Sequence, residues 1–362
     1  MLSKEEILRF KRQLQLPELG EQGQEALKNA RVLVVGAGGL GNVVCAYLAA
    51  AGVGKLTIID HDIVDVSNLQ RQVMFTQNDL GLSKAKQLAF RLNQLNELSE
   101  YQYINQKFTL ENSIELSVGQ DLIIDCVDQI DVRYLLNDVS VFQNIPLIYG
   151  AIHRFEGQVA VFNYQGSGTY RCAFPEKKSI QKSPTCQEEG VIGVLPGIIG
   201  LYQAMEALKI IGQLKWVMKN QILMVNLLQT SHVKIAFKRN DKAIEMAKNR
   251  MASIQESSIE KENNSIYFND IESFLKKKSS IIIIDIQEEL EQSELYGIPV
   301  KHIPAYLFQE QIQLFDKAQS ILVYCSKGVK SSWAIEVMKQ FGFKYIYQIA
   351  GGISSVKEKR NG

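Results

Sequence analysis

The stretch Arg31-Val-Leu-Val-Val-Gly-Ala-Gly-Gly-Leu-Gly41 decides the fold that this chain is expected to adopt. β-Prone apolar residues run into a glycine-rich turn, and apolar residues at helical spacing follow from Val43 to Ala51. This order predicts a strand, a tight turn and a helix, whose N-terminus favours a phosphate. The predicted ligand is a nucleotide, but the turn alone leaves NAD, FAD and ATP open. The glycines expected to meet it are Gly36, Gly38, Gly39 and Gly41.

Strands and helices alternate after this turn, which predicts a mostly parallel sheet with helices on both faces. Beyond residue 150 the pattern changes to that of antiparallel strands. We therefore expect an α/β fold, a Rossmann-like domain with a mixed sheet. The expected strands are 55–60, 121–126, 146–150, 157–164, 222–228 and 232–238. The expected helices are 3–29, with a break near Pro17 and Gly20, and 83–96, 131–143 and 193–211.

A second, smaller α/β domain is expected at the C-terminal end of the chain. Residues 239–263 are highly charged and lack proline and glycine, which indicates a partly helical linker. Beyond it, apolar strands are expected at 280–285, 320–325 and 345–349. The predicted organisation is a nucleotide-binding domain over 1–238, a linker over 239–263 and a small domain over 264–362.

Composition limits the classes of partner. The 362 residues carry 40 basic and 39 acidic side chains, so no global charge attracts nucleic acid or a membrane surface. The sequence has no signal peptide pattern and no long uninterrupted apolar run, so no membrane span is expected. Its five cysteines are odd in number and form no C-x-x-C pair. These features favour a reducing, cytoplasmic location and disfavour a zinc site built from paired cysteines.

The loop after strand 55–60 distinguishes between the nucleotides. Asp60 stands where a carboxylate meets a ribose hydroxyl in Rossmann-like folds. A dehydrogenase needs little more than this, whereas the loop adds further amides and cations. Cations at a phosphate site suit a triphosphate attacked at its α-phosphorus, and Asp128 can hold Mg²⁺. Together, these residues predict adenylation with ATP and Mg²⁺. The residues that join Asp60 and Asp128 in this prediction are Asn68, Gln70, Arg71 and Lys84.

The same residues resemble those of a known family. The glycine turn, Asp60, Ser67-Asn-Leu-Gln-Arg-Gln72, Lys84, Asp125-Cys-Val-Asp128 and Thr185-Cys186 are similar to motifs of the bacterial ubiquitin-activating-enzyme-like adenylyltransferases, the ThiF/MoeB/HesA group. The resemblance covers residues 3–238. It implies that ATP adenylates the terminal carboxylate of a ubiquitin-like sulfur-carrier protein of the ThiS/MoaD type, which ends in Gly-Gly, and that pyrophosphate is released.

The resemblance also implies roles for individual residues. Gly39 and Asp60 would contact the adenosine end of ATP, and Asp128 would hold Mg²⁺. The phosphates would be bound by Asn68, Arg71 and Lys84. Arg12 matches the family's N-terminal arginine, which reaches the ATP of the partner subunit, so a homodimer is implied.

Three positions depart from the family pattern or carry an open role. This chain has Thr169-Tyr-Arg-Cys172 where the family has Cys-Tyr-Arg-Cys. The family's second pair of cysteines, near the end of the domain, is also missing from this chain, so structural zinc is expected to be absent. Gln129 replaces an asparagine beside the metal-binding aspartate. Cys186, on the crossover segment, fits equally well a nucleophile or sulfur acceptor and a small packed residue.

The C-terminal domain carries a second thiol motif, Cys325-Ser-Lys-Gly-Val-Lys-Ser331. Loop N–H groups, the following helix dipole, Lys327 and Lys330 would favour a thiolate or persulfide. The segment 264–356 resembles the rhodanese-type sulfurtransferases, with further landmarks in Asp285, His302-Ile-Pro304 and Gly351-Gly-Ile353. Two arginines common in that family are absent, one of them replaced by Lys330. The resemblance implies an active Cys325, loaded by an upstream persulfide donor such as a cysteine desulfurase.

The resulting prediction is an adenylyltransferase that activates a sulfur carrier and a Cys325 persulfide that converts it to a thiocarboxylate. Two alternatives remain. A carrier-binding scaffold would bind the carrier without ATP turnover, and a Rossmann NAD or FAD oxidoreductase would give no role to Asn68, Arg71 and Lys84. The sequence leaves the pathway open among thiamine, molybdopterin and other sulfur pathways.

Overall fold

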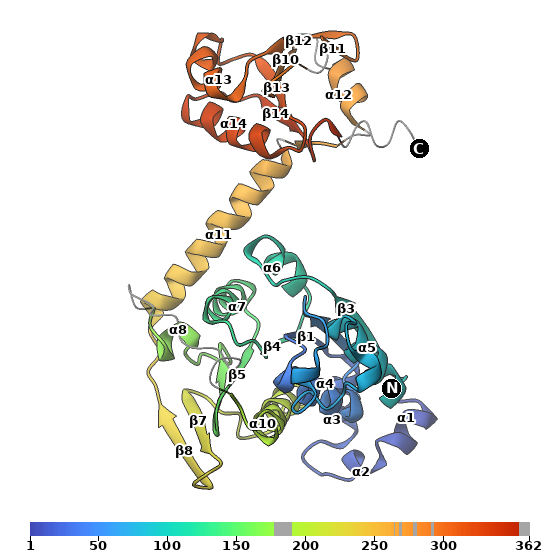
Figure 1. The fold of residues 1–362 in the computed structure, drawn as a ribbon. Helices are drawn as coiled ribbons and strands as arrows, with labels where there is room; N and C mark the ends of the chain where they lie inside the picture. The colour runs from blue at the N-terminus through green and yellow to red at the C-terminus, as the bar shows by residue number, and fades with distance from the viewer. Residues whose placement is uncertain (177–189, 264, 268–269, 278–280, 291–292, 355–362) are drawn as a thin grey trace. The chain divides into compact units, whose positions relative to one another are not determined.

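The computed structural model describes residues 1–176, 190–263, 265–267, 270–277, 281–290 and 293–354. These residues form two compact units, Met1–Ala252 and Ser253–Gly362 (Figure 1). The division falls inside the segment 239–263 that the sequence indicates as a linker. Each unit has its own sheet and its own hydrophobic core.

The first unit is built on one eight-stranded mixed sheet, in agreement with the predicted fold class. Its spatial order is β3-β2-β1-β4-β5-β6-β7-β8. The five strands from β3 to β5 are parallel, and the pairs from β5 to β8 are antiparallel. The strands are β1 Arg31–Val35, β2 Lys55–Ile59, β3 Glu100–Ile104, β4 Leu122–Asp125, β5 Leu147–His153, β6 Glu156–Phe162, β7 Gln221–Asn226 and β8 Ser231–Ala236.

Helices cover this sheet, because β1, β2 and β4 are almost entirely buried apolar residues that need cover on both faces. In Figure 1, α4 and α10 lie on one side of the central strands and α6 and α7 on the other. The helices are α1 Lys4–Arg9, α2 Lys11–Leu14, α3 Gly20–Asn29, α4 Gly39–Ala51, α5 Lys84–Leu95, α6 Leu110–Ser117, α7 Ile130–Gln143, α8 Tyr170–Ala173 and α10 Val194–Ile211.

Helix α10 is long and apolar enough to cross a membrane, by length and composition only. From the sequence, no segment of such length and apolar character was expected. The helix packs against α4, β5 and β6, and its residues Leu195, Ile199, Ala204 and Ala207 are buried in the core of the unit. These contacts are those of a core helix.

Several segments differ from the predicted elements, and the predicted helix 3–29 is divided into α1, α2 and α3. Strand β3 and helix α6 had no predicted counterpart, because Glu100-Tyr-Gln-Tyr-Ile104 is a largely exposed edge strand with little apolar character. Helix α11 spans Asp241–Asn263, so the predicted linker is helical almost throughout. Its first half belongs to the first unit, where Ala247 and Met251 are buried.

The second unit contains a six-stranded sheet with the order β11-β12-β10-β13-β14-β9. Its three predicted strands are confirmed as β10, β13 and β14, which are parallel neighbours. The strands are β9 Ser265–Ile266, β10 Ile281–Asp285, β11 Glu294–Leu295, β12 Ile298–His302, β13 Ser320–Tyr324 and β14 Ile346–Ile349. The helices are α12 Ile271–Lys277, α13 Ala305–Gln311 and α14 Val329–Gln340.

Candidate functional site

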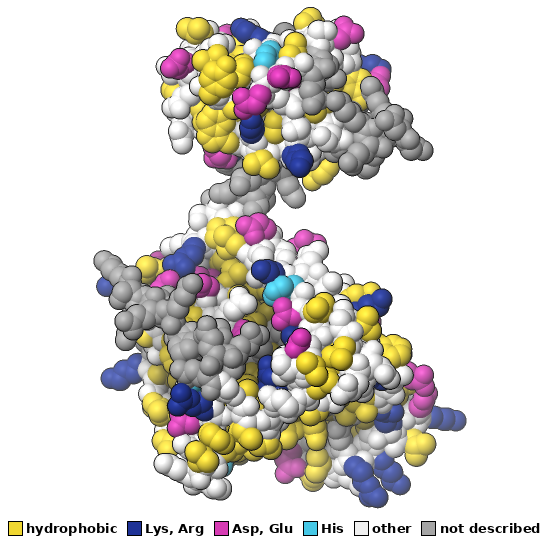
Figure 2. All heavy atoms as spheres, viewed as in Figure 1, with side chains coloured by type: hydrophobic (Ala, Val, Ile, Leu, Met, Phe, Trp, Pro, Cys, Tyr) yellow, Lys and Arg dark blue, Asp and Glu magenta, His cyan; other side chains and the backbone are white. Residues whose placement is uncertain are grey.

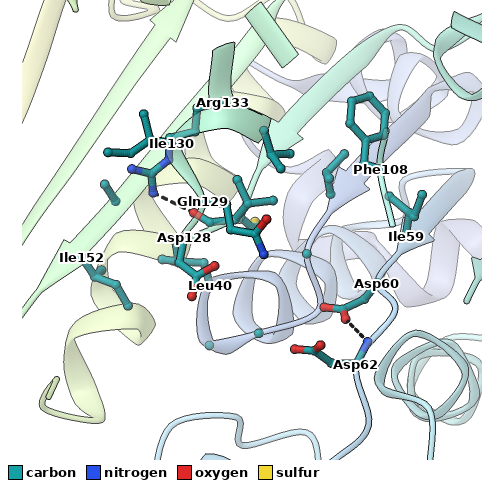
Figure 3. A pocket seen from close by; sticks show the side chains of 18 of the residues that line it. Leu40, Ile59, Asp60, Asp62, Phe108, Asp128, Gln129, Ile130, Arg133 and Ile152 are labelled. Atoms are coloured by element: carbon teal, nitrogen blue, oxygen red, sulfur yellow. Dashed lines mark hydrogen bonds between the residues drawn. The ribbon is translucent and has the colours of Figure 1, made fainter. Parts of the chain in front are cut away.

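A cavity of about 1050 Å³ lies in the first unit, at the carboxyl ends of β1, β2 and β4. Parallel strands bring their carboxyl ends to one sheet edge, so residues far apart in sequence meet there. Figure 3 shows the start of α4 in this cavity, with Asp60 and Asp62 on one side and Asp128 on the other. The predicted site residues that line the cavity are Gly36, Gly38, Gly39, Asp60, Asn68, Arg71, Lys84, Asp128 and Gln129.

The glycine turn depends on the absence of side chains. Gly36 has φ +101°, and a Cβ there would lie 2.6 Å from the Cys126 carbonyl oxygen. A Cβ on Gly41 would lie 2.0 Å from the Gly36 carbonyl oxygen, so Gly41 serves helix–turn packing and does not line the cavity. Gly38 is the N-cap of α4 and provides no side-chain cap. The N-terminus of α4 is therefore available to bind an anion.

Replacing Gly41 with alanine should destabilise the chain by roughly 3 kcal/mol, because the new methyl group would overlap backbone that cannot move aside easily. Thermal and urea unfolding would measure this. Gly197 in α10 is a matched control, since a Cβ there meets nothing within 4 Å. Gly197→Ala should leave stability unchanged or raise it by up to about 1 kcal/mol. Equal stability of the two variants would contradict the packing role of Gly41.

Asp60 holds the glycine turn to the end of β2. One carboxylate oxygen accepts the Ala37 N–H at 2.7 Å and the other accepts the Asp62 N–H at 2.8 Å. Burial raises the pKa of Asp60, and these two hydrogen bonds act in the opposite direction. Asp60 thus fixes the turn from within, and its contact with a ribose stays a prediction.

The cationic side of the cavity is formed by the loop after β2 and the start of α5. Lys84 is 5% exposed, and its ammonium group lies 2.9 Å from the Asp62 carboxylate. Asn68 is also buried, and the partly exposed Arg71 donates to the Ser67 carbonyl oxygen at 3.0 Å. A buried cation with one half-exposed carboxylate as its partner can still attract a polyanion.

Asp128 and Gln129 stand at the opposite wall, directly after β4 and before α7 (Figure 3). Both are exposed, and the Asp128 carboxylate has no hydrogen bond or ion pair with the described residues. An unpaired carboxylate beside an amide oxygen is a donor set that fits Mg²⁺. A second group, Asp60, His61 and Asp62, has ligand atoms within 4.8 Å of one another, but its carboxylates already accept N–H groups and pair with Lys84.

The cavity continues beyond these residues along the β5–β6 hairpin. This end combines aromatic and apolar side chains with a few polar groups. The Tyr149 hydroxyl lies 3.0 Å from the Gln158 amide oxygen. Sequence reasoning missed this end, because Gly157 to Tyr164 shows only strand alternation. It also missed the loop after β3, for which no signal was available. The missed residues include Gln106, Lys107, Phe108, Thr109, Arg133, Tyr149, Ile152, Glu156, Gln158 and Phe174.

The remaining predicted site residues lie elsewhere. Gln70 is exposed and does not line the cavity, and its carbonyl oxygen faces Gly193. Arg12 on α2 is exposed and does not line the cavity of its own chain. Cys186 lies outside the described residues.

Cys325 follows β13 in the second unit, directly before the loop that enters α14. Its thiol is only 3% exposed, and its sulfur accepts the Ser331 N–H at a distance of 3.4 Å. The Ser331 hydroxyl in turn donates to the Gln348 amide oxygen at 3.1 Å. Lys330 pairs with Glu288 at 2.6 Å, so its charge is engaged by a carboxylate. A cavity of about 380 Å³ beside the loop is lined by Lys327, Gly328, Ser332, Gln348 and Gly351, among others.

The Cys172 thiol has hydrogen-bonding partners on two segments of the first unit. Its sulfur accepts the Asn240 N–H at 3.2 Å and lies 3.4 Å from the Thr169 hydroxyl. This contact joins α8 to the residue just before α11.

Comparisons with known proteins connect this geometry to a family. The model of the ThiF family matches residues 10–250. A protein of Porphyra purpurea named "Probable molybdopterin-synthase adenylyltransferase" is 37% identical over 98% of this chain and 93% of its own length. The "Sulfur carrier protein adenylyltransferase" of Thermus thermophilus is 42% identical over 66% of this chain and 90% of its own.

A further relative also matches this chain across both units. The "Probable adenylyltransferase/sulfurtransferase MoeZ" of Mycobacterium tuberculosis is 32% identical over 97% of this chain and 93% of its own length. Among solved structures, MccB from E. coli is similar to this chain with a TM-score of 0.58, at 19% identity, over 66% of this chain and 72% of that one. The latter likeness concerns the fold.

Proposed function

The chain belongs to the ThiF family, and we propose that it adenylates the C-terminal glycine of a ubiquitin-like sulfur-carrier protein and then takes part in its conversion to a thiocarboxylate. The observation that carries the first step is the composition of one cavity. It is lined by the glycine turn, by the cations Arg71 and Lys84 and by the carboxylate of Asp128. A nicotinamide or flavin cofactor would leave these cations without a role.

The proposed reaction begins with ATP at the glycine turn and the carrier tail at the β5–β6 end of the cavity. An extended Gly-Gly tail carries no side chains, so it needs little room in the cavity. Its carboxylate oxygen attacks the α-phosphorus, a new P–O bond forms, and pyrophosphate leaves. Arg71 and Lys84 would stabilise the negative charge that develops on the phosphate oxygens. Mg²⁺ held by Asp128 would neutralise part of that charge when bound.

The second step concerns the thiol of Cys325. The outer sulfur of a Cys325 persulfide would attack the acyl carbon, and AMP would leave, which forms an acyl disulfide that an added thiol cleaves to the thiocarboxylate. Linking both units in one chain raises the effective concentration of the sulfur donor. Cys186 is proposed as a second candidate nucleophile, and an upstream persulfide donor such as a cysteine desulfurase as the source of sulfur.

Further parts of the proposal concern assembly and surroundings. We propose a homodimer, because Arg12 can meet ATP only at the cavity of a second copy if it acts as in the family. Structural zinc is proposed to be absent, because the second cysteine pair of the family is missing from the sequence and Cys172 is hydrogen-bonded to Asn240 and Thr169. The free thiols Cys45, Cys126, Cys172 and Cys325 suit a cytoplasmic location. Charged side chains of both signs are scattered over the visible face in Figure 2, which suits a protein partner better than nucleic acid or a membrane.

The test is exchange of labelled pyrophosphate into ATP with a panel of carriers that end in Gly-Gly. Exchange should require the carrier and its last glycine, and Arg71→Ala should lower it by about a hundredfold. Arg31→Ala is the matched control, since Arg31 is exposed at the amino end of β1, far along the strand from the cavity. Exchange that needs no carrier and is unaffected by Arg71→Ala would refute the proposal. Tight carrier binding without ATP turnover would favour the scaffold alternative.

A further inference from the structure

Arg133 on α7 is a largely buried cation at the cavity wall to which the proposed reaction gives no role. Its side chain is 12% exposed. Its Nη2 donates to the Val127 carbonyl oxygen at 2.7 Å (Figure 3). It also donates more weakly to the Gly150 carbonyl oxygen at 3.4 Å. Val127 directly precedes Asp128, and Gly150 belongs to β5. One guanidinium group therefore joins the segment that follows β4 to the middle of the neighbouring strand β5, next to the proposed metal ligand Asp128.

The same backbone position is held from its other side by Asp125. The Asp125 carboxylate is 1% exposed, and its Oδ1 accepts the Val127 N–H at 3.0 Å. Its Oδ2 lies 3.6 Å from Arg133 Nε, so the two charges face each other without a hydrogen bond. The N–H and the C=O of Val127 are thus both bound, one by a buried carboxylate and one by a buried guanidinium group.

The guanidinium group is itself fixed by its surroundings. Its central carbon lies 5.2 Å from the centre of the Tyr149 ring, within the range of a cation–π contact. Burial between a carboxylate and an aromatic face leaves Arg133 few other rotamers. By contrast, the Asp128 side chain is exposed and has no hydrogen bond or ion pair with the residues that the structure describes. Its orientation therefore depends on the backbone that precedes it.

We propose that Arg133, together with Asp125, is a positioning residue of the adenylation reaction, which clamps Val127 so that the Asp128 carboxylate faces the metal and the phosphates. This inference rests on the proposed function. A lysine cannot replace the clamp, because one ammonium group lacks the planar fork that meets a carbonyl and stacks on a ring at the same time.

The test uses Arg133→Lys and Asp125→Asn in the full chain, with Arg91→Lys as the matched control. Arg91 forms an ion pair with the buried Asp79 on the same unit but does not line the cavity. Binding of ATP is measured by titration calorimetry over a series of Mg²⁺ concentrations, and pyrophosphate exchange is measured over the same series. Arg133→Lys should raise the Mg²⁺ concentration for half-maximal ATP binding and exchange by roughly tenfold or more. The KM for the carrier should change by less than about twofold.

The outcomes separate the roles. A smaller rise with Asp125→Asn, and none with Arg91→Lys, would support the clamp. An unchanged Mg²⁺ dependence with a raised carrier KM would overturn it and make Arg133 a substrate-binding residue. An unchanged Mg²⁺ dependence with only a lower melting temperature would also overturn it and make Arg133 a residue of the fold. Because ATP binding needs no carrier, the inference fails separately from the proposed function, which fails if the unmodified chain gives no carrier-dependent exchange.

Discussion

Replacing Lys84 with methionine is expected to lower carrier-dependent pyrophosphate exchange by roughly a hundredfold to a thousandfold. Lys84 begins α5, is 5% exposed and lines the cavity with its charged end near Asp62. A cation in such a dry setting interacts strongly with the charge that builds on the phosphate oxygens of the transition state. Methionine keeps the length and apolar stem of the side chain, so the loss measures the charge.

Lys86→Met is the control for this prediction. Lys86 lies two residues further along the same helix and is exposed, so the same chemical change there should leave exchange within about twofold of the original rate. Initial rates at saturating ATP and carrier would be compared for both variants, with unfolding curves to confirm that each is folded. A Lys84→Met variant as active as Lys86→Met would mean that Lys84 serves only to pair with Asp62.

The part of the site that was predictable from sequence is the part that follows strand ends. A glycine turn, and polar residues directly after apolar strands, must meet at one edge of a parallel sheet. Gly36, Asp60 and Asp128 therefore line one cavity as expected. Lys84 was predictable only as a member of a set of cations and amides near the turn, because a single lysine at a helix start has no spatial signal of its own.

The remainder depends on tertiary contacts that no local pattern encodes. Arg133 sits within the predicted helix 131–143 like any surface arginine, and only the fold places it against Asp125 and the Val127 carbonyl oxygen. Tyr149 belongs to a strand whose apolar pattern predicts burial and does not predict a cavity wall. Similarly, the charged composition of 239–263 suggested a linker, although Ala247 and Met251, at helical spacing in the first half of α11, are buried.

Replacing Cys325 with serine is expected to abolish thiocarboxylate formation and to leave carrier-dependent pyrophosphate exchange unchanged. The two readouts separate because the cavity proposed to bind ATP is lined by residues of the first unit, whereas Cys325 belongs to the second. Serine keeps the size of the side chain but cannot form a persulfide. The carrier would be incubated with ATP, a cysteine desulfurase, L-cysteine and a thiol reductant, and its mass would report exchange of oxygen for sulfur at the C-terminus.

The surroundings of Cys325 explain why this one thiol should carry the sulfur. The Ser331 N–H and the N-terminus of α14 both point positive charge at its sulfur, which favours an anionic persulfide. Cys172 is partly exposed and hydrogen-bonded to Asn240, and it lies within the four-residue helix α8. It therefore does not stand at the start of a loop that enters a long helix, as Cys325 does, and Cys172→Ser should retain both activities. If Cys325→Ser still yields thiocarboxylate while Cys186→Ser does not, the sulfur is delivered through Cys186, and the loop before α14 is a structural remnant of a sulfurtransferase.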